Sequence, residues 1–105
     1  MESIVELRHL RTLVALQETG SVSLAAQRVF LTQSALSHQI RLLENHFETP
    51  LFERKSAPLR FTPAGERLLK LARELLPRVA DAERDLIQIV HGEAGELRLA
   101  VECHT

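Results

Sequence analysis

The strongest constraint on this chain is a heptad repeat in its second half. Seven apolar residues recur at alternating intervals of four and three: Leu68, Ala72, Leu75, Val79, Ala82, Leu86 and Ile89. This spacing predicts one long helix with an apolar seam of the kind that packs against another helix. Thr62 as N-cap and Pro63 at the first helical position mark its start, and we expect it to end at about Val90, before Gly92.

Such a helix is longer than the preceding residues can cover. About 27 residues at 1.5 Å each give roughly 40 Å. We therefore expect the seam to bind a second copy of the chain, and packing of the seam on its own domain is the alternative. Pro77 lies inside the helix, where a kink is expected.

The first half of the chain has the outline of a helix-turn-helix. Apolar spacing predicts a first helix over residues 6–19, which Gly20 ends as a C-terminal glycine. A short second helix follows, with Ser21 or Ser23 as its cap and the small Ala25-Ala26 pair turned inward.

A third helix is predicted over residues 33–47, with Thr32 as its cap. Its inward stripe consists of Leu36, Ile40, Leu43 and Phe47. The opposite face is polar. A short helix, a tight connection and a longer helix in this order are typical of a helix-turn-helix.

A change of period after Pro50 predicts a β-hairpin. Two short strands are expected at 51–54 and 59–62, joined by a turn over 55–58. A hairpin in this place is a wing. Because an isolated hairpin is marginally stable in water, we expect it to pack against the helices, with Phe52 and Phe61 as the anchors.

The predicted fold is mainly α: a winged helix-turn-helix of three helices and a two-stranded wing, followed by a long dimerisation helix. We expect a DNA-binding domain over 1–62, a linker and dimerisation helix over 63–91, and a hinge with a first strand over 92–105. That strand, at 97–101, has no sheet to join within this chain, so we interpret it as the start of a second domain that has been cut away.

Composition excludes several classes of protein. The 105 residues are 45% apolar and 26% charged, which is close to the globular average and argues against wholesale disorder. The single Cys excludes an internal disulfide and a Cys-based zinc finger, and it fits a reducing compartment. Because no run of 18 apolar residues occurs and residues 1–4 show no secretory leader, we expect a cytoplasmic protein without a membrane partner.

Catalytic and metal-binding patterns are missing as well. The sequence offers no set of nucleophile, base and orienting residue and no Gly-rich phosphate loop. His91 with Cys103-His104 matches no known metal-site spacing. We therefore expect no enzyme activity, no metal and no cofactor in this chain.

The charge pattern gives only a weak indication of the partner. The net charge of −1 by itself argues weakly against nucleic acid. However, residues 1–62 hold seven Lys and Arg against six acids, whereas residues 63–105 hold six against eight. The mildly basic part is therefore the helix-turn-helix, where a polyanion would bind.

The polar face of the third helix and the wing hold side chains suited to reading DNA. Gln33 can bond bidentately to adenine, Ser34 and Ser37 can donate to phosphates or bases, and His38 can donate to phosphate or guanine. The predicted DNA-binding residues are Thr32, Gln33, Ser34, Ser37, His38, Arg41, Arg54, Lys55, Arg60 and Arg28. Two alternatives remain open: an ordinary solvated helix face, and edge-strand charges at Lys55 and Arg60 that prevent aggregation.

Five motifs occur in one order along the chain: Gly20-Ser21 with Ala25-Ala26, Thr32 to Ile40 (TQSALSHQI), Leu43-Glu44, Leu51-Phe52-x-Arg54, and Phe61 to Gly65 (FTPAG). Together they resemble the N-terminal domain of LysR-type bacterial transcriptional regulators, over about residues 7–101. The resemblance implies that Gln33, Ser34, Ser37 and His38 contact DNA, with Arg54 in the wing. Many members have Arg at the position of His38, which implies a weaker, more pH-sensitive contact here.

The resemblance also implies partners. It implies a homodimer through the long helix, a dimer of dimers in the full protein, binding to interrupted inverted repeats, and an effector-binding domain beyond this chain. RNA polymerase is a further candidate partner. Residues 54–63 and 97–104 look most like the branch of the family that regulates methionine biosynthesis in response to homocysteine.

One position departs from the family pattern. Glu48 follows the third helix where most members have Gly, and a non-Gly residue in a left-handed C-cap costs on the order of 1 kcal/mol. Either Glu48 bears this cost or the turn differs. Outside the family, the main alternative function is a winged-helix module that docks proteins and binds no specific DNA.

Overall fold

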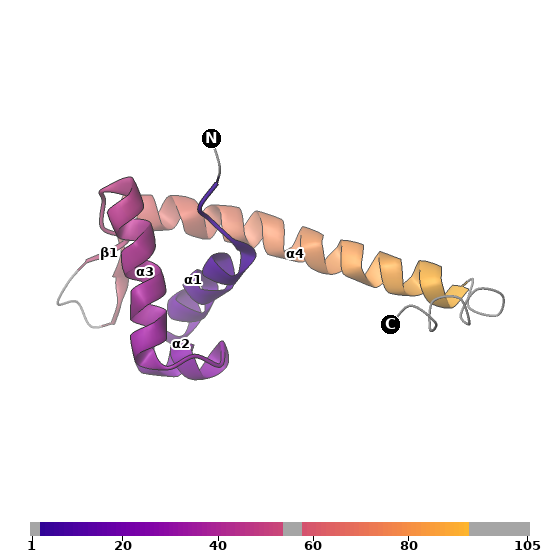
Figure 1. Ribbon diagram of the computed structural model, residues 1–105, viewed down its shortest axis with the longest axis horizontal. Helices are drawn as coiled ribbons and strands as arrows, with labels where there is room; N and C mark the ends of the chain where they lie inside the picture. The colour runs from indigo at the N-terminus through magenta and orange to yellow at the C-terminus, as the bar shows by residue number, and fades with distance from the viewer. Residues whose placement is uncertain (1–2, 54–57, 93–105) are drawn as a thin grey trace.

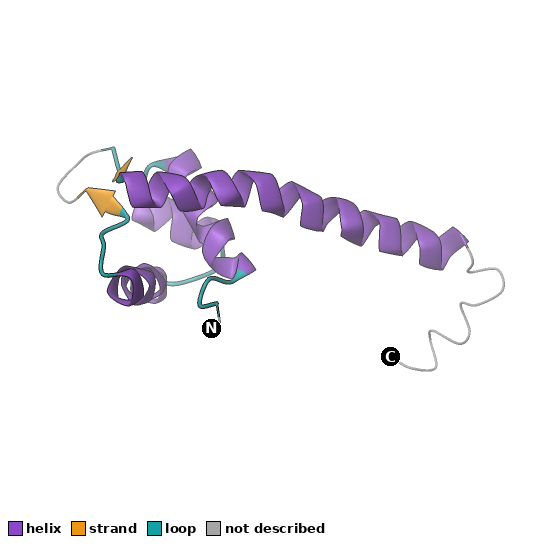
Figure 2. Cartoon of the chain, turned by 90° about the horizontal axis from the view of Figure 1, so that it is seen from above, coloured by secondary structure: helices purple, strands orange, loops and turns teal. Residues whose placement is uncertain are grey.

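The structure, a computed structural model, describes residues 3–53 and 58–92. Its elements are α1 (Leu7–Thr19), α2 (Val22–Arg28), α3 (Gln33–Phe47), β1 (Phe52–Glu53), β2 (Arg60–Phe61) and α4 (Pro63–Gly92). The first three helices and the two strands gather around the start of α4, and the rest of α4 extends beyond them as a rod (Figure 1). Seen from above, α3 lies on the side of the domain away from α4 (Figure 2).

Helix α1 forms the centre of the core and is capped at both ends. Gly20 ends it in the left-handed conformation, with φ 68°, as the sequence predicted. At the other end the backbone N–H of Glu6 donates to Nδ1 of His9 at 3.0 Å, which closes a capping box. His9 is buried, and burial, the main influence, lowers its pKa below the ordinary value of 6.5. The Glu6 carboxylate opposes this shift in pKa, and Arg8 adds to it.

The helix-turn-helix forms as predicted. Ser21 and not Ser23 caps α2, since its Oγ accepts from the backbone N–H of Leu24 at 3.2 Å. Ala25 and Ala26 are buried where α2 meets α1, because small side chains let two helices approach closely. In α3 the described bounds and the Thr32 cap are the predicted ones.

One residue of the predicted α3 stripe is not in the core. Leu36, Ile40 and Leu43 are buried, but Phe47 is 46% exposed. The prediction for Phe47 was wrong because α3 runs past the end of the core at its last turn. The next residue, Glu48, adopts the left-handed C-cap conformation, with φ 54° and ψ 42°. It therefore bears the conformational free-energy cost expected for a non-Gly residue at this position.

The wing is present, and its strands are shorter than predicted. β1 and β2 pair antiparallel, with Phe52 opposite Phe61 and Glu53 opposite Arg60. The two phenyl rings lie with their centroids 4.6 Å apart, which confirms them as the anchors. Most of the predicted turn over 55–58 and the strand at 97–101 lie outside the described residues.

Helix α4 divides into two halves with different surroundings. It runs without a break through Pro77 and on to Gly92, so the expected end near Val90 was too early. Its first half packs on α1, where Ala72 is fully buried. Ala72 therefore faces its own domain and not a partner, which corrects its place in the predicted dimer seam.

The other seam residues differ in exposure along the helix. Leu68, Leu75 and Val79 are half-buried. In the second half of α4 no described residue covers the seam, and Leu86 and Ile89 are 61% and 55% exposed. The alternative of packing on the same domain thus holds for the first half only.

Candidate nucleic-acid interface

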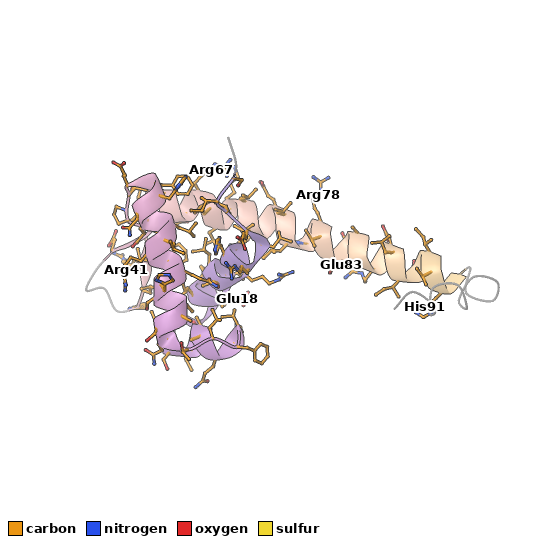
Figure 3. All side chains as sticks on the ribbon, viewed as in Figure 1. Glu18, Arg41, Arg67, Arg78, Glu83 and His91 are labelled. Carbon is orange, nitrogen blue, oxygen red and sulfur yellow. The ribbon has the colours of Figure 1, made fainter. Side chains whose placement is uncertain are left out.

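The outward face of α3 carries the polar residues predicted to read DNA. Gln33, Ser34, His38 and Arg41 are exposed, and Ser37 is half-buried. Because the apolar stripe of α3 packs in the core, these side chains share the surface that points away from it. Figure 3 shows Arg41 extending from the middle of α3 on the side of the wing.

Thr32 has a structural role at the start of this face. Its Oγ1 accepts from the backbone N–H of Ala35 at 3.0 Å and so caps α3. The cap fixes the first turn, which presents Gln33 and Ser34 at the positive end of the helix dipole. The threonine itself is exposed.

The recognition face and the wing border one cleft. This cleft has a volume of about 500 Å³ and lies between α3 and the strands. Ser37 and Arg41 line it from α3, and Phe52 and Leu59 line it from the wing side. The structure therefore brings the polar face of α3 and the base of the wing to the same side of the domain.

Two hydrogen bonds hold α3 in its orientation. Behind the face, Oγ1 of the buried Thr12 donates to Oε1 of Gln39 at 2.8 Å and ties α3 to α1. At the far end, Oε2 of Glu44 accepts from the backbone N–H of Leu51 at 2.8 Å. The partner of Glu44, a residue of the Leu43-Glu44 motif, is thus a backbone amide and not a basic side chain.

Leu51 is the point at which the wing is fastened, and the sequence analysis missed it. Its carbonyl accepts from the backbone N–H of Thr62 at 3.0 Å, and its side chain is buried. A Cβ on Gly65 would lie 2.2 Å from that carbonyl oxygen, so only glycine allows α4 to approach. The FTPAG motif was the available signal, since it places a glycine inside the first turn of a helix.

Two of the remaining predicted cations, Arg28 and Arg60, lie beside acidic residues in this structure. Arg28 forms an ion pair with Glu18, Nη1 to Oε1 2.7 Å, and both side chains are about half exposed. Arg60 stands opposite Glu53 across the wing. Arg54 and Lys55 lie outside the described residues.

The electrostatics of α3 favour a polyanion. Glu44 is the only acid between Gln33 and Phe47, and its carboxylate is turned toward Leu51. Gln33, Ser34, Ser37 and His38 therefore supply hydrogen-bond donors with no carboxylate among them, whereas Glu44 and Glu53 line the cleft beside Arg41. Such a surface can donate to phosphates and to base edges without like-charge repulsion.

A helix-turn-helix with a two-stranded wing and an outward polar recognition helix defines a winged-helix DNA-binding domain. Residues 7–66 match the family described as "Bacterial regulatory helix-turn-helix protein, lysR family". The chain belongs to this family of transcription regulators, and it is not an enzyme. It is 70% identical, over 98% of its length, to the HTH-type transcriptional regulator MetR of Haemophilus influenzae.

Solved structures agree with this assignment. The DNA-binding domain of BenM in complex with catB site 1 DNA is 37% identical, with a TM-score of 0.76, over 85% of this chain and 96% of that one. The full-length regulator LysG of Corynebacterium glutamicum with bound effector Arg is 28% identical, with a TM-score of 0.74, over 82% of this chain and 29% of that one. The predicted fold is thus confirmed in relatives, one of which holds DNA.

The chain spans about a third of the length of the curated relatives it matches. Among residues 3–53 and 58–92, no helix is long and apolar enough to cross a membrane. The same residues contain no cluster of His, Cys, Asp or Glu that could hold a metal ion.

Proposed function

We propose that this domain reads an interrupted inverted repeat as a homodimer, and that the protein to which it belongs controls methionine-biosynthesis genes in the bacterial cytoplasm. The observation that carries the DNA-reading part is the exposed face of the first two turns of α3, which holds hydrogen-bond donors and no carboxylate. Two such faces in a dimer would enter successive major grooves, and the geometry of the dimer would set the spacing of the half-sites.

Two residues of α3 have different roles in this proposal. Gln33, in the first turn, has the amide that bonds bidentately to adenine, so it reads sequence. Arg41, two turns further on, carries a cation that neutralises phosphate, so it adds affinity for any duplex. Ser34, Ser37 and His38 supply further donors between them.

The first experiment is equilibrium binding of the chain to a duplex with an interrupted inverted repeat and to a scrambled duplex, at several salt concentrations. If about three cations of each protomer neutralise phosphates, the dimer neutralises about six, and the slope of log K against log salt is near −5. Equal and weak binding to both duplexes would contradict sequence reading and favour the alternative of a protein-docking module.

Substitutions separate the two roles. Gln33→Ala should remove about 1–3 kcal/mol of preference for the repeat and change non-specific binding little. Arg41→Ala should weaken both duplexes about equally and make the salt slope shallower by about two, because the dimer loses one cation from each protomer. Arg11→Ala removes an exposed cation from α1, outside both the predicted DNA-binding residues and α4, and serves as the control. An unchanged ratio of the two affinities in Gln33→Ala would exclude base reading by Gln33.

The proposed dimer joins two α4 helices in antiparallel orientation. The first half of α4, up to Val79, contains four cations and two acids. The second half contains Arg84 and three acids, namely Asp81, Glu83 and Asp85. Antiparallel pairing sets the basic half of each helix beside the acidic half of the other, and the exposed Leu86 and Ile89 supply apolar area. Sedimentation equilibrium tests this dimer.

The effector and the target genes are proposed from the similarity to relatives. The chain is similar to MetR of Haemophilus influenzae. The methionine pathway, and homocysteine as the effector, follow from the resemblance of residues 54–63 and 97–104 to one branch of the family. LysG holds its effector in a chain of which this one covers 29%, which supports an effector site in a separate domain. Operator binding by the full-length protein, with and without homocysteine, tests this assignment; methionine is the control ligand.

A further inference from the structure

The turn between α2 and α3 carries an exposed aromatic side chain in an unusual backbone conformation. Phe30 is 92% exposed, the highest value among the large apolar residues that the structure describes. Its φ is 61°, in the left-handed region. The backbone N–H of Phe30 donates to the carbonyl of Gln27 at 3.2 Å, and that of Leu31 donates to the carbonyl of Ala26 at 2.8 Å. This is the Schellman pattern, which ends a helix with one left-handed residue.

The turn explains the backbone conformation of Phe30 but not the choice of phenylalanine. Glycine is the usual residue at such a position, because a side chain is strained in the left-handed region. A bulky aromatic residue there is an outlier. Since the ring is solvated, the described residues offer it almost no packing to offset the strain. Residues held in strained conformations cluster at functional sites, so the ring calls for a function outside the fold.

Phe30 stands beside a groove that combines apolar and cationic side chains. The groove has a volume of about 370 Å³ and lies between α1, the end of α2 and α3. Val29 and Leu31, both half-buried, supply its apolar wall. Three exposed arginines also line it, namely Arg8, Arg11 and Arg28. Aromatic rings and guanidinium groups are enriched where proteins bind one another.

The charge of the groove favours an acidic partner. No carboxylate is among the described residues that line it. Arg8 pairs with Glu6 and Arg28 with Glu18, but all four side chains are more than half exposed, so a carboxylate of a partner can compete for the arginines. Arg11 forms no ion pair within the described part of the chain. Its charge is therefore available to a complementary surface.

The groove lies on the flank of α3 that is turned away from the wing. Gln39 lines the groove, whereas Ser37 and Arg41 line the cleft on the wing side. Successive residues of a helix are about 100° apart, so a step of two residues reaches the opposite flank. Figure 1 shows the same arrangement, with β1 on one side of α3 and α1 and α2 on the other. A partner in the groove therefore leaves the polar face of α3 open to DNA.

We infer that this groove docks an acidic segment of a partner protein. One apolar side chain of the segment packs against Phe30 and Leu31, and the carboxylates that flank it bind Arg11 and the neighbouring arginines. This docking function is separate from the proposed reading of an inverted repeat and does not depend on it. It gives a reason for the strained position of Phe30, since the ring is held in solvent for the partner.

A short capped peptide with a fluorescent label, a central leucine and aspartates and glutamates on both sides of it, is the probe. In one control peptide asparagine and glutamine replace the acids, and in the other serine replaces the leucine. Fluorescence anisotropy at low salt should show the acidic leucine peptide binding about tenfold more tightly than either control, with an affinity that falls as salt is added. Equal affinities for the acidic and the amide peptide would overturn the proposal.

Substitutions separate docking from stability and from DNA binding. Phe30→Gly should weaken peptide binding about tenfold or more, and the urea midpoint should not fall, because glycine relieves the left-handed strain. Arg11→Ala should weaken peptide binding about threefold to tenfold and leave duplex binding unchanged, whereas Arg41→Ala should do the reverse. Leu24→Ala, the control, removes a 52% exposed side chain of α2 that lies outside the groove. Peptide affinities that are unchanged in Phe30→Gly and Arg11→Ala would contradict the assignment.

Backbone amide chemical shifts locate the bound probe on the isotope-labelled chain. The largest changes should occur at residues 28–31, Arg11 and Gln39, and not at Gln33 or His38. Changes centred on Gln33 and His38 would show that the peptide merely replaces DNA, which overturns the proposal. A single-stranded oligonucleotide that shifts the groove residues when the peptide does not would assign the groove to nucleic acid instead. Absence of peptide binding at millimolar concentration also overturns docking, whatever the result with the inverted-repeat duplex.

Discussion

The two halves of α4 carry the same heptad pattern and meet different environments. In the first half the seam residue Ala72 is buried against the helix-turn-helix, and Leu68 and Leu75 are half-buried. In the second half the same periodicity leaves Leu86 and Ile89 more than half exposed. An apolar seam thus indicates that one face of a helix packs against other residues, but it does not indicate whether they belong to the same chain or to another copy. In this chain Ala72 packs on its own domain, whereas Leu86 and Ile89 remain exposed.

The largest expected effect comes from the first half, where backbone meets backbone. Gly65→Ala would bring a Cβ to 2.2 Å from the carbonyl oxygen of Leu51. Because backbone cannot yield as a flexible side chain does, we expect a loss of about 3 kcal/mol or more of unfolding free energy. Urea denaturation followed by circular dichroism measures it. Gly92→Ala is the control, since no heavy atom lies within 4 Å of its added Cβ.

A leucine pair tests the difference between the halves directly. Leu69→Ala, in the buried half, should cost about 2–5 kcal/mol of folding stability. Leu86→Ala, in the exposed half, should cost less than about 0.5 kcal/mol at concentrations where the chain is monomeric, and should weaken self-association instead. Denaturation at low and high protein concentration separates the two effects. Similar folding losses in both variants would show that the second half packs on its own domain.

The smallest effect concerns α1, the helix that covers the first half of α4. Burial lowers the pKa of His9, and the folded state therefore favours the neutral imidazole. As the pH falls below about 6.5, the unfolded chain takes up a proton that the folded chain resists, so the free energy of unfolding decreases. His9→Gln should flatten this dependence between pH 7 and pH 5. A stability that is equal at both pH values in the unchanged chain would contradict it.

The fold was largely predictable because its signals are local. Thr32, Ser21 and Gly20 cap helices through their own turns, and the alternation of the wing places Phe52 and Phe61 on one face. Such features depend on residues that are close in sequence, so local sequence patterns predict them. The failures lie at boundaries: Phe47 belongs to a valid apolar stripe but falls beyond the core, and the helix that begins at Pro63 extends past Val90.

The candidate site was predictable as a face and not as a set of contacts. Gln33, Ser34, His38 and Arg41 follow from helical spacing once the buried stripe is known. The contacts that hold the face, from Gln39 to Thr12 and from Glu44 to Leu51, join residues of different elements. The ion pair that engages Arg28 joins α2 to α1 in the same way.

By itself, the sequence determined the helices, the wing, the polar face of α3 and the apolar seam of α4, because caps and periodicity act within a few residues. Only the tertiary structure decided how the seam of α4 is shared. The helix-turn-helix is long enough to cover α4 as far as Ala72 and Leu75, and no described residue covers Leu86 or Ile89. That limit is set by the size of the packed domain, a property of the whole fold.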